Sequence, residues 1–130
     1  MYEYSIGVTE QTALEAEWNC RTWGGSLTSI ESKAEQEHIN SLLQKGESYL
    51  IGLDYLKSNH TVNFTNWDKD QPMTAGAQHC TVLWPPTRRW RNVRCSAKHP
   101  YICKRDSGLV INYDDFEYKV SELQMAWIDA

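Results

Sequence analysis

The spacing of hydrophobic and polar residues changes midway along the chain, from a helical period to the alternation of strands. In the first part, apolar residues recur every three or four positions from Ala13 to Trp23, with Cys20 on the same face. Thr12 and Glu15 form a capping box before this segment. The Gly-Gly pair that follows, at 24–25, is a typical helix stop. The pattern therefore predicts a first helix that turns Cys20 toward the core.

A second helix is expected a few residues later. Ser32 and Glu35 provide an N-terminal cap, and Gly46 is expected to end the helix. Its buried stripe is expected at Ile39, Leu42 and Leu43. His38 lies beside that stripe and is interpreted as a boundary histidine with a structural hydrogen bond.

Strands dominate the rest of the body. Residues 2–5 alternate as a half-buried strand does, although this run is short. Later runs are separated by Gly, Pro, Asn and Ser clusters, and they predict strands at 49–53, 61–65, 81–84, 89–93 and 101–104. The stretch 67–79 is too long for a hairpin turn and is interpreted as a functional or disulfide-anchored loop. The order of elements indicates an α+β fold.

The end of the chain differs in pattern and in charge. Its apolar residues Phe116, Val120, Leu123 and Trp127 are spaced as on one face of a helix. Residues 1–106 carry 12 acidic and 12 basic side chains, so the whole formal charge of −4 resides in residues 107–130. We therefore divide the chain into a globular domain, 1–106, and an acidic, helix-compatible tail, 107–130. The tail could pack on the domain, cover its basic segment, bind a partner or lack fixed structure.

Composition limits the class of protein. The 130 residues, 41% hydrophobic and 23% charged, suit one globular domain. The longest apolar run, 49–53, is far shorter than the roughly 20 residues that span a bilayer. Acidic residues from Glu3 to Glu17 interrupt the region where a signal peptide would have its apolar core. Secretion therefore has to be inferred from other features.

Four cysteines, at 20, 80, 95 and 103, provide such a feature. They contain no C-x-x-C pair, so two disulfides are favoured over free thiols or a zinc site, and three connectivities are open. Asn59 and Asn63 begin glycosylation sequons, which favours the secretory route. None of the common hydrolase or phosphate-binding motifs occurs, and the histidines have no evident nucleophile partner, so we expect no enzyme.

Taken in order, several motifs resemble those of a C-type lectin-like domain over about residues 2–105. They are Gly24-Gly25-x-Leu27-x-x-Ile30, Ile51-Gly52-Leu53, Phe64-x-Asn66-Trp67, Trp90-x-x-Val93-x-Cys95 and Pro100-Tyr101-Ile102-Cys103. The resemblance implies two helices flanking two small antiparallel sheets, with a long loop region. It also implies the disulfides Cys20–Cys103 and Cys80–Cys95. The usual extra first strand is missing, so the chain could be a fragment, and the short interval before Trp67 suggests a trimmed second hairpin.

Relatives that bind sugar through calcium carry carboxylates at three places in the loop region. The corresponding positions here are Gln71-Pro72-Met73, Gln78, and the pair Arg91-Asn92. Calcium prefers six to eight oxygen ligands that include carboxylates, and Met73 and Arg91 are poor substitutes. No Asp or Glu occurs from Gln71 to Arg105, where seven basic residues do. We therefore expect no cofactor and no metal, with calcium disfavoured.

A second calcium position in some relatives resembles the set Ser29, Glu31 and Glu35, completed by a Glu after the final cysteine. That last position is Lys104 here. We hypothesise that the Lys104 ammonium takes the place of the ion as the partner of Glu31 and Glu35. The alternative is an exposed face of unrelated charges, where ion pairs contribute about 0–1 kcal/mol.

A basic and aromatic surface is left as the candidate binding site. Arginine binds sulfate, phosphate and carboxylate, and aromatic rings stack on sugars or fill protein hot spots. We expect an extracellular, calcium-independent recognition module for a protein or an acidic or sulfated glycan; a carbohydrate-binding lectin with a calcium-dependent or unconventional site is the alternative. Nucleic acid is disfavoured because the chain is acidic overall. The candidate ligand-binding residues are Gln71, Gln78, Trp84, Arg88, Arg89, Trp90, Arg91 and Asn92.

Overall fold

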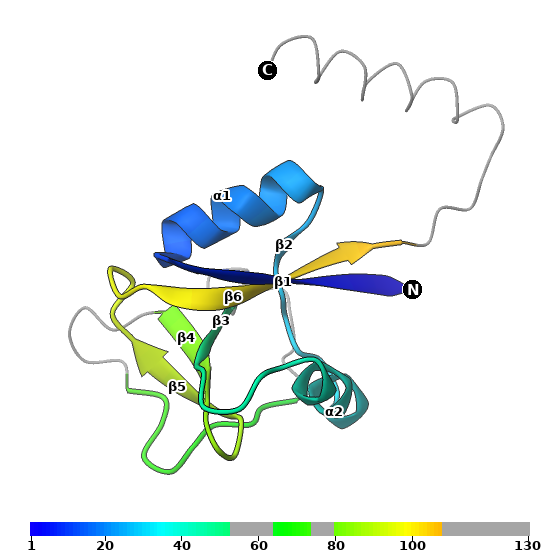
Figure 1. The fold of residues 1–130 in the computed structure, drawn as a ribbon. Coiled ribbons are helices and arrows are strands. Elements are labelled where there is room, and N and C mark those ends of the chain that lie inside the picture. The colour runs from blue at the N-terminus through cyan, green and yellow to red at the C-terminus, as the bar shows by residue number, and fades with distance from the viewer. Residues whose placement is uncertain (53–63, 74–79, 108–130) are drawn as a thin grey trace, which may run out of the picture.

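The computed structural model describes residues 1–52, 64–73 and 80–107. Strand β1 is followed by helix α1, a short strand β2 and helix α2, and four further strands complete the order (Figure 1). The predicted glycosylation sites Asn59 and Asn63, the predicted site residue Gln78 and residues 108–130 of the tail lie outside the described residues. The elements are β1 (Tyr2–Gln11), α1 (Ala13–Trp23), β2 (Ser26–Leu27), α2 (Lys33–Ser41), β3 (Tyr49–Ile51), β4 (Cys80–Trp84), β5 (Arg89–Val93) and β6 (His99–Asp106).

Local sequence signals determine where both helices begin. The Thr12 hydroxyl accepts from the Glu15 backbone N–H at 3.2 Å, and the Glu15 carboxylate accepts from the Thr12 N–H, so the predicted capping box is confirmed. Gly24 ends α1 with φ 99°, as the Gly-Gly stop predicts. The Ser32 hydroxyl caps α2 through the Glu35 N–H at 3.0 Å.

The end of α2 corrects the sequence prediction. The helix stops at Ser41 rather than running to Gly46, because the Leu42 N–H turns to the Ile39 carbonyl at 2.9 Å. Leu42 is 41% exposed, so it is not part of the buried stripe, whereas Ile39 is fully buried. His38 is exposed and stacks at a tilt against Tyr4 with ring centroids 5.5 Å apart.

The strands form one mixed sheet in the order β1-β6-β3-β4-β5, with β2 added to β6. All neighbours are antiparallel except β3 and β6, which meet in parallel at Leu50 and Tyr101. The two small antiparallel sheets that the resemblance implies are thus joined through β3 and β6. Strand β1 extends to Gln11, well beyond the predicted 2–5, because β6 pairs with it over most of its length. Phe64 and Thr65, predicted at the end of a strand, lie in irregular backbone.

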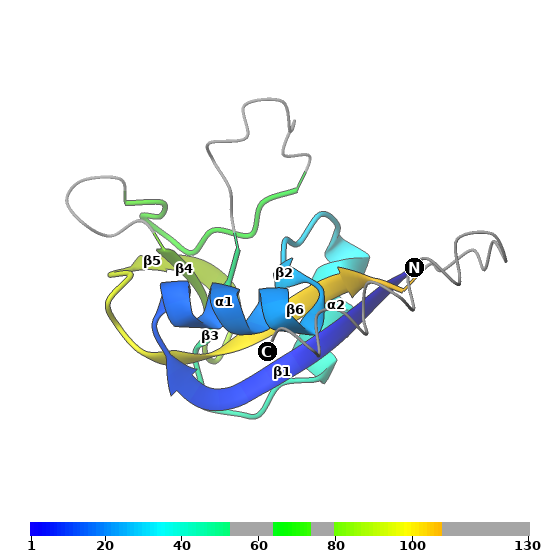
Figure 2. The same cartoon turned by 90° about the horizontal axis from the view of Figure 1, so that it is seen from above.

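Alternation along the strands divides the core into two layers, with α1 on one face of the sheet and α2 at the other (Figures 1 and 2). The layer with α1 joins Ala16, Cys20, Leu50, Val82, Tyr101 and Cys103. The layer with α2 joins Ile30, Ile39, Tyr49, Ile51, Leu83, Trp90 and Ile102.

Two disulfides connect these elements as the resemblance implied. Cys20–Cys103 ties α1 to β6 across 83 positions, and Cys80–Cys95 closes a loop of 15 positions that contains β4 and β5. The described cysteines are therefore all oxidised.

Candidate functional site

The candidate site lies on the β4–β5 hairpin, where an arginine, a tryptophan and a carboxylate are stacked together. Trp84 is 37% exposed and is paired in register with Arg89. The Arg91 guanidinium lies 4.8 Å from the centroid of the Trp84 ring, and its Nε donates to Asp68 Oδ2 at 2.7 Å. We call Asp68, Trp84, Arg89 and Arg91 the Trp84 face.

The segment 64–73 positions Asp68 against the hairpin. The Asp68 N–H donates to the Trp90 carbonyl at 3.0 Å, and the Trp90 N–H donates to the Asn66 carbonyl at 2.8 Å. Backbone hydrogen bonds therefore hold this segment along β5 and fix the carboxylate beside Arg91. An ordered guanidinium stacked on an indole ring is an arrangement suited to binding anions or planar ligand groups.

Electrostatics on the Trp84 face favour an anion. Hydrogen bonds from Arg91 and from the Lys69 N–H hold the pKa of Asp68 below its usual value, and the charges of Arg91 and Arg89 act in the same direction. Asp68 is therefore ionised at neutral pH. Since two guanidinium groups face one carboxylate, the face has one excess positive charge, and the exposed Arg89 is its most accessible cation.

Two of the predicted site residues lie inside the fold, which corrects that part of the prediction. Trp90 is fully buried, and its Nε1 donates to Gln36 Oε1 at 2.8 Å. Arg88 is 8% exposed, and its guanidinium donates to the backbone carbonyls of Gln44 and Glu47. Both side chains are used in packing the α2 side, so neither is available to a ligand.

Gln71 and Asn92 lie close together, and the side-chain oxygen of each accepts a backbone hydrogen bond. Gln71 Oε1 accepts from the Asn92 N–H at 2.9 Å, and Asn92 Oδ1 accepts from the Met73 N–H at 2.8 Å. The two amide oxygens that would have to face a cation are thereby engaged in holding segment 64–73 to β5.

The second candidate calcium position holds an ammonium group. Lys104 Nζ lies 2.8 Å from Glu35 Oε2, and the two side chains are only 8% and 12% exposed. Lys104 also approaches the Ser29 hydroxyl at 3.4 Å. The predicted pairing of Lys104 with Glu35 is confirmed, whereas among the described residues no ion pair joins Lys104 to the Glu31 carboxylate. Glu31 contributes its backbone N–H, which donates to Glu35 Oε1 at 2.7 Å.

The Glu35 carboxylate is the acceptor for every group around it. Burial alone would raise its pKa, but hydrogen bonds from Lys104, the Tyr4 hydroxyl and the Glu31 N–H outweigh burial and leave the pKa below its usual value. Burial and the bond to Glu35 raise the pKa of Tyr4, which keeps its hydroxyl protonated as a donor. The group is therefore an ionic network in which Lys104, Tyr4 and the Glu31 backbone all donate to the Glu35 carboxylate.

Sequence reasoning missed two residues that organise the site, Asp68 and Gln36. Asp68 lies just before the acid-free stretch, and only its position beside Trp67 hinted at the loop region. Gln36 is 4% exposed and accepts the Trp90 indole N–H, although its polar side chain on a helix gave no sign of burial.

Comparison with known proteins agrees with this architecture. The family model described as "Lectin C-type domain" matches residues 9–105. The chain is 36% identical over 107 residues to C-type mannose receptor 2 of Mus musculus, and the match covers 75% of this chain but 7% of that protein. Human lithostathine has the same fold with a TM-score of 0.73 at 24% identity, over 82% of this chain and 84% of that one. A calcium-independent type II antifreeze protein gives a TM-score of 0.72 at 24% identity, over 80% and 85%.

The family match and the fold define a lectin-like recognition domain rather than an enzyme. The chain belongs to the C-type lectin domain family. Within the described residues, no helix is long and apolar enough to cross a membrane.

Proposed function

We propose that the chain is an extracellular, calcium-independent recognition module that binds an anionic group of its ligand, a sulfate or carboxylate, on the Trp84 face. The observation that carries the proposal is the Arg91 guanidinium, held between the Trp84 ring and Asp68 beside the exposed Arg89. The indole can cover an apolar or sugar surface while the arginines bind the anion. Acidic or sulfated glycans and acidic protein patches both offer this chemistry.

The donor set supports independence from calcium. Gln71 and Asn92 use their amide oxygens internally, and Arg91, the residue before Asn92, carries a fixed positive charge that is paired with Asp68. A hard divalent cation would have to displace the bonds of both amides, and the nearby Asp68 carboxylate is already paired with Arg91. The fold itself tolerates this state, since the solved antifreeze protein with the same fold is described as calcium-independent. Two disulfides support an extracellular location, where such bonds persist.

The proposal is tested by binding to a panel of neutral, carboxylated and sulfated oligosaccharides, with and without EDTA. We expect binding to a sulfated or carboxylated probe that EDTA does not change, and a loss of about tenfold or more on Arg89→Gln, since charge-assisted bonds contribute about 1.5–3 kcal/mol. The matched control is Arg21→Gln, which removes the same charge from exposed α1 and is expected to leave binding unchanged. EDTA-sensitive binding to neutral sugars would overturn the proposal.

A further inference from the structure

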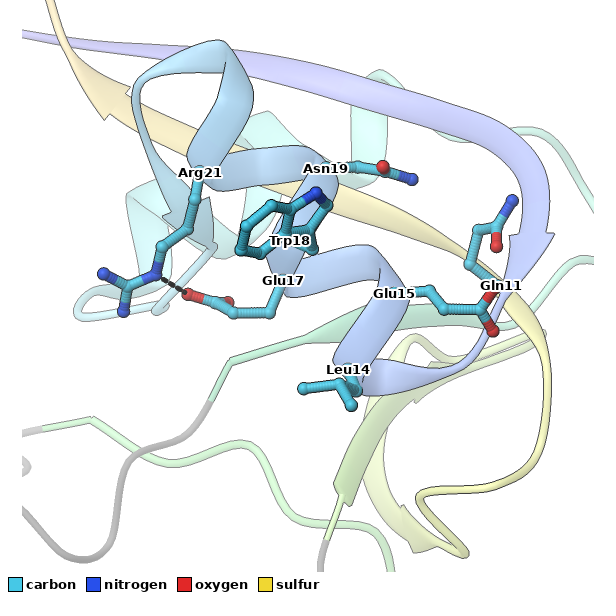
Figure 3. Close-up of a pocket in the computed structure, with 7 residues that line it drawn as sticks. All are labelled: Gln11, Leu14, Glu15, Glu17, Trp18, Asn19 and Arg21. Atoms are coloured by element: carbon cyan, nitrogen blue, oxygen red, sulfur yellow. Dashed lines mark hydrogen bonds and ion pairs between the residues drawn. The ribbon is translucent and has the colours of Figure 1, made fainter. Parts of the chain in front are cut away.

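The outer face of α1 exposes two large apolar side chains that the core does not need. Leu14 and Trp18, one helical turn apart, are 83% and 71% exposed, whereas Ala16 and Cys20 on the inner face are fully buried. Leu14 and Trp18 line an open hollow along the helix with Gln11, Glu15, Glu17, Asn19 and Arg21 around them (Figure 3). Contiguous apolar patches that are rimmed by polar residues mark interaction surfaces on soluble proteins.

The chain leaves the described structure at one end of this face. Arg105, near the end of β6, lies 4.1 Å from the centroid of the Trp23 ring and donates to the Trp23 carbonyl at 2.8 Å. Ser107 is anchored by its N–H to the Met1 carbonyl at 2.8 Å. The described part of the chain therefore ends two residues beyond Arg105, which contacts the last residue of α1.

Residues 108–130 contain a stripe that matches the α1 face in spacing. Phe116, Val120, Leu123 and Trp127 are separated by four, three and four positions. On α1, Leu14, Trp18 and Arg21 are separated by four and three. Such stripes allow two helices to pack side by side.

The connecting segment is long enough for this packing. The six residues 108–113 can extend to about 20 Å, whereas Trp23 and Leu14 are about 14 Å apart along the α1 axis. A tail helix that starts near Trp23 and runs toward Leu14 is antiparallel to α1. The linker then does not have to cross the length of α1.

Charge agrees with the antiparallel direction. In that arrangement the acidic start of the stripe, at Asp114, Asp115 and Glu117, comes to the end of α1 that carries Arg21. The Arg21 side chain is 68% exposed and has only the neighbouring Glu17 as its ion-pair partner among the described residues. The reverse direction would place the same acids beside Glu15.

We infer that the outer face of α1, Leu14 with Trp18, is a docking site for residues 114–130 of the same chain, which pack on it as an antiparallel amphipathic helix. The occupant is this chain's own tail and not a second copy or an unrelated partner. The docking residues Leu14 and Trp18 are not part of the Trp84 face, so a variant at either surface tests one proposal without removing a residue of the other.

The test is hydrogen exchange of the full chain followed by mass spectrometry. We expect peptides from 114–130 to exchange about tenfold or more slowly than an unstructured segment, and to lose this protection in the double variant Leu14→Ser, Trp18→Ser. The matched control is Val8→Ser, which removes an equally exposed apolar side chain from β1 and is expected to keep the protection. Because all three residues are exposed, the variants should keep the thermal midpoint of the domain.

Three results would overturn the inference. Exchange of 114–130 at the unprotected rate in the unmodified chain would show that the tail does not dock. Protection that survives the double variant would place the contact elsewhere. Protection that rises with protein concentration, together with a dimer mass in light scattering, would make a second copy the occupant.

Discussion

Lys104 and Glu35 form the most buried ion pair among the described residues, with side chains that are only 8% and 12% exposed. Removing one partner of a buried ion pair leaves an uncompensated charge, which costs about 3–5 kcal/mol. We therefore expect Lys104→Met to lower the free energy of unfolding by that amount in urea titrations. The double variant Lys104→Met, Glu35→Leu should recover part of the loss, and a single variant of unchanged stability would contradict this role.

The same pair predicts a pH dependence. The pKa of Glu35 is lower in the folded than in the unfolded chain, so its contribution is complete above the unfolded value of 4.5 and is lost as the pH falls through the folded value. Stability measured in urea should decline below about pH 4.5, and Glu35→Gln should flatten that decline. An equally steep decline in Glu35→Gln would assign the acid sensitivity to other carboxylates.

The role of Lys104 could be inferred from the sequence because a positive charge replaced an acid at a motif position. The roles of Trp90 and Arg88 could not. Their sequence neighbourhood is basic and aromatic, but burial depends on which strand face meets α2 and segment 64–73, and these are long-range contacts. Arg89 and Arg91 share the opposite face from Trp90, as alternation in a strand requires.

At the level of elements, the turn between α1 and β2 passes close to the backbone of β6. A Cβ on Gly25 would lie 2.2 Å from the Lys104 carbonyl oxygen, which is backbone and cannot move aside. We expect Gly25→Ala to cost about 3 kcal/mol, the upper range for overpacking. Thermal unfolding would measure it.

Gly24→Ala is the control for this turn. A Cβ at Gly24 has open space around it but a φ of +99°, so its cost is the conformational strain of about 1–2 kcal/mol. Equal losses of stability in Gly24→Ala and Gly25→Ala would mean that backbone strain, and not steric overlap, determines the cost of both substitutions.

Element starts were better predicted than element ends. Thr12 and Ser32 are local caps, so short-range sequence is sufficient to locate both helix N-termini. The end of α2 and the full length of β1 depend on partners far along the chain, since β6 determines how far β1 continues. Hydrophobic periodicity and capping motifs are local, so they carry no information about partners that lie far along the chain.

At the scale of the whole molecule, the two disulfides differ in what they hold. Cys20–Cys103 closes the longer loop, so its loss is expected to cost more than 4 kcal/mol, against about 3 kcal/mol for Cys80–Cys95. Paired Cys→Ala variants compared in urea should show this order. The shorter bridge anchors β4 and β5, so its removal should weaken ligand binding more than its smaller stability cost suggests. The reverse order of stability would contradict the loop-closure argument.

We propose that Arg91 and Lys104 take the place that calcium has in other lectin-like domains. Thermal unfolding of the full chain in millimolar calcium and in EDTA tests this proposal. Calcium at a concentration 100 times the Kd of its site would raise the free energy of unfolding by about 2.7 kcal/mol. In a domain of this size, that would raise the thermal midpoint by about 10 °C or more. We predict the same midpoint in both solutions, and a midpoint that rises by several degrees in calcium would contradict the claim.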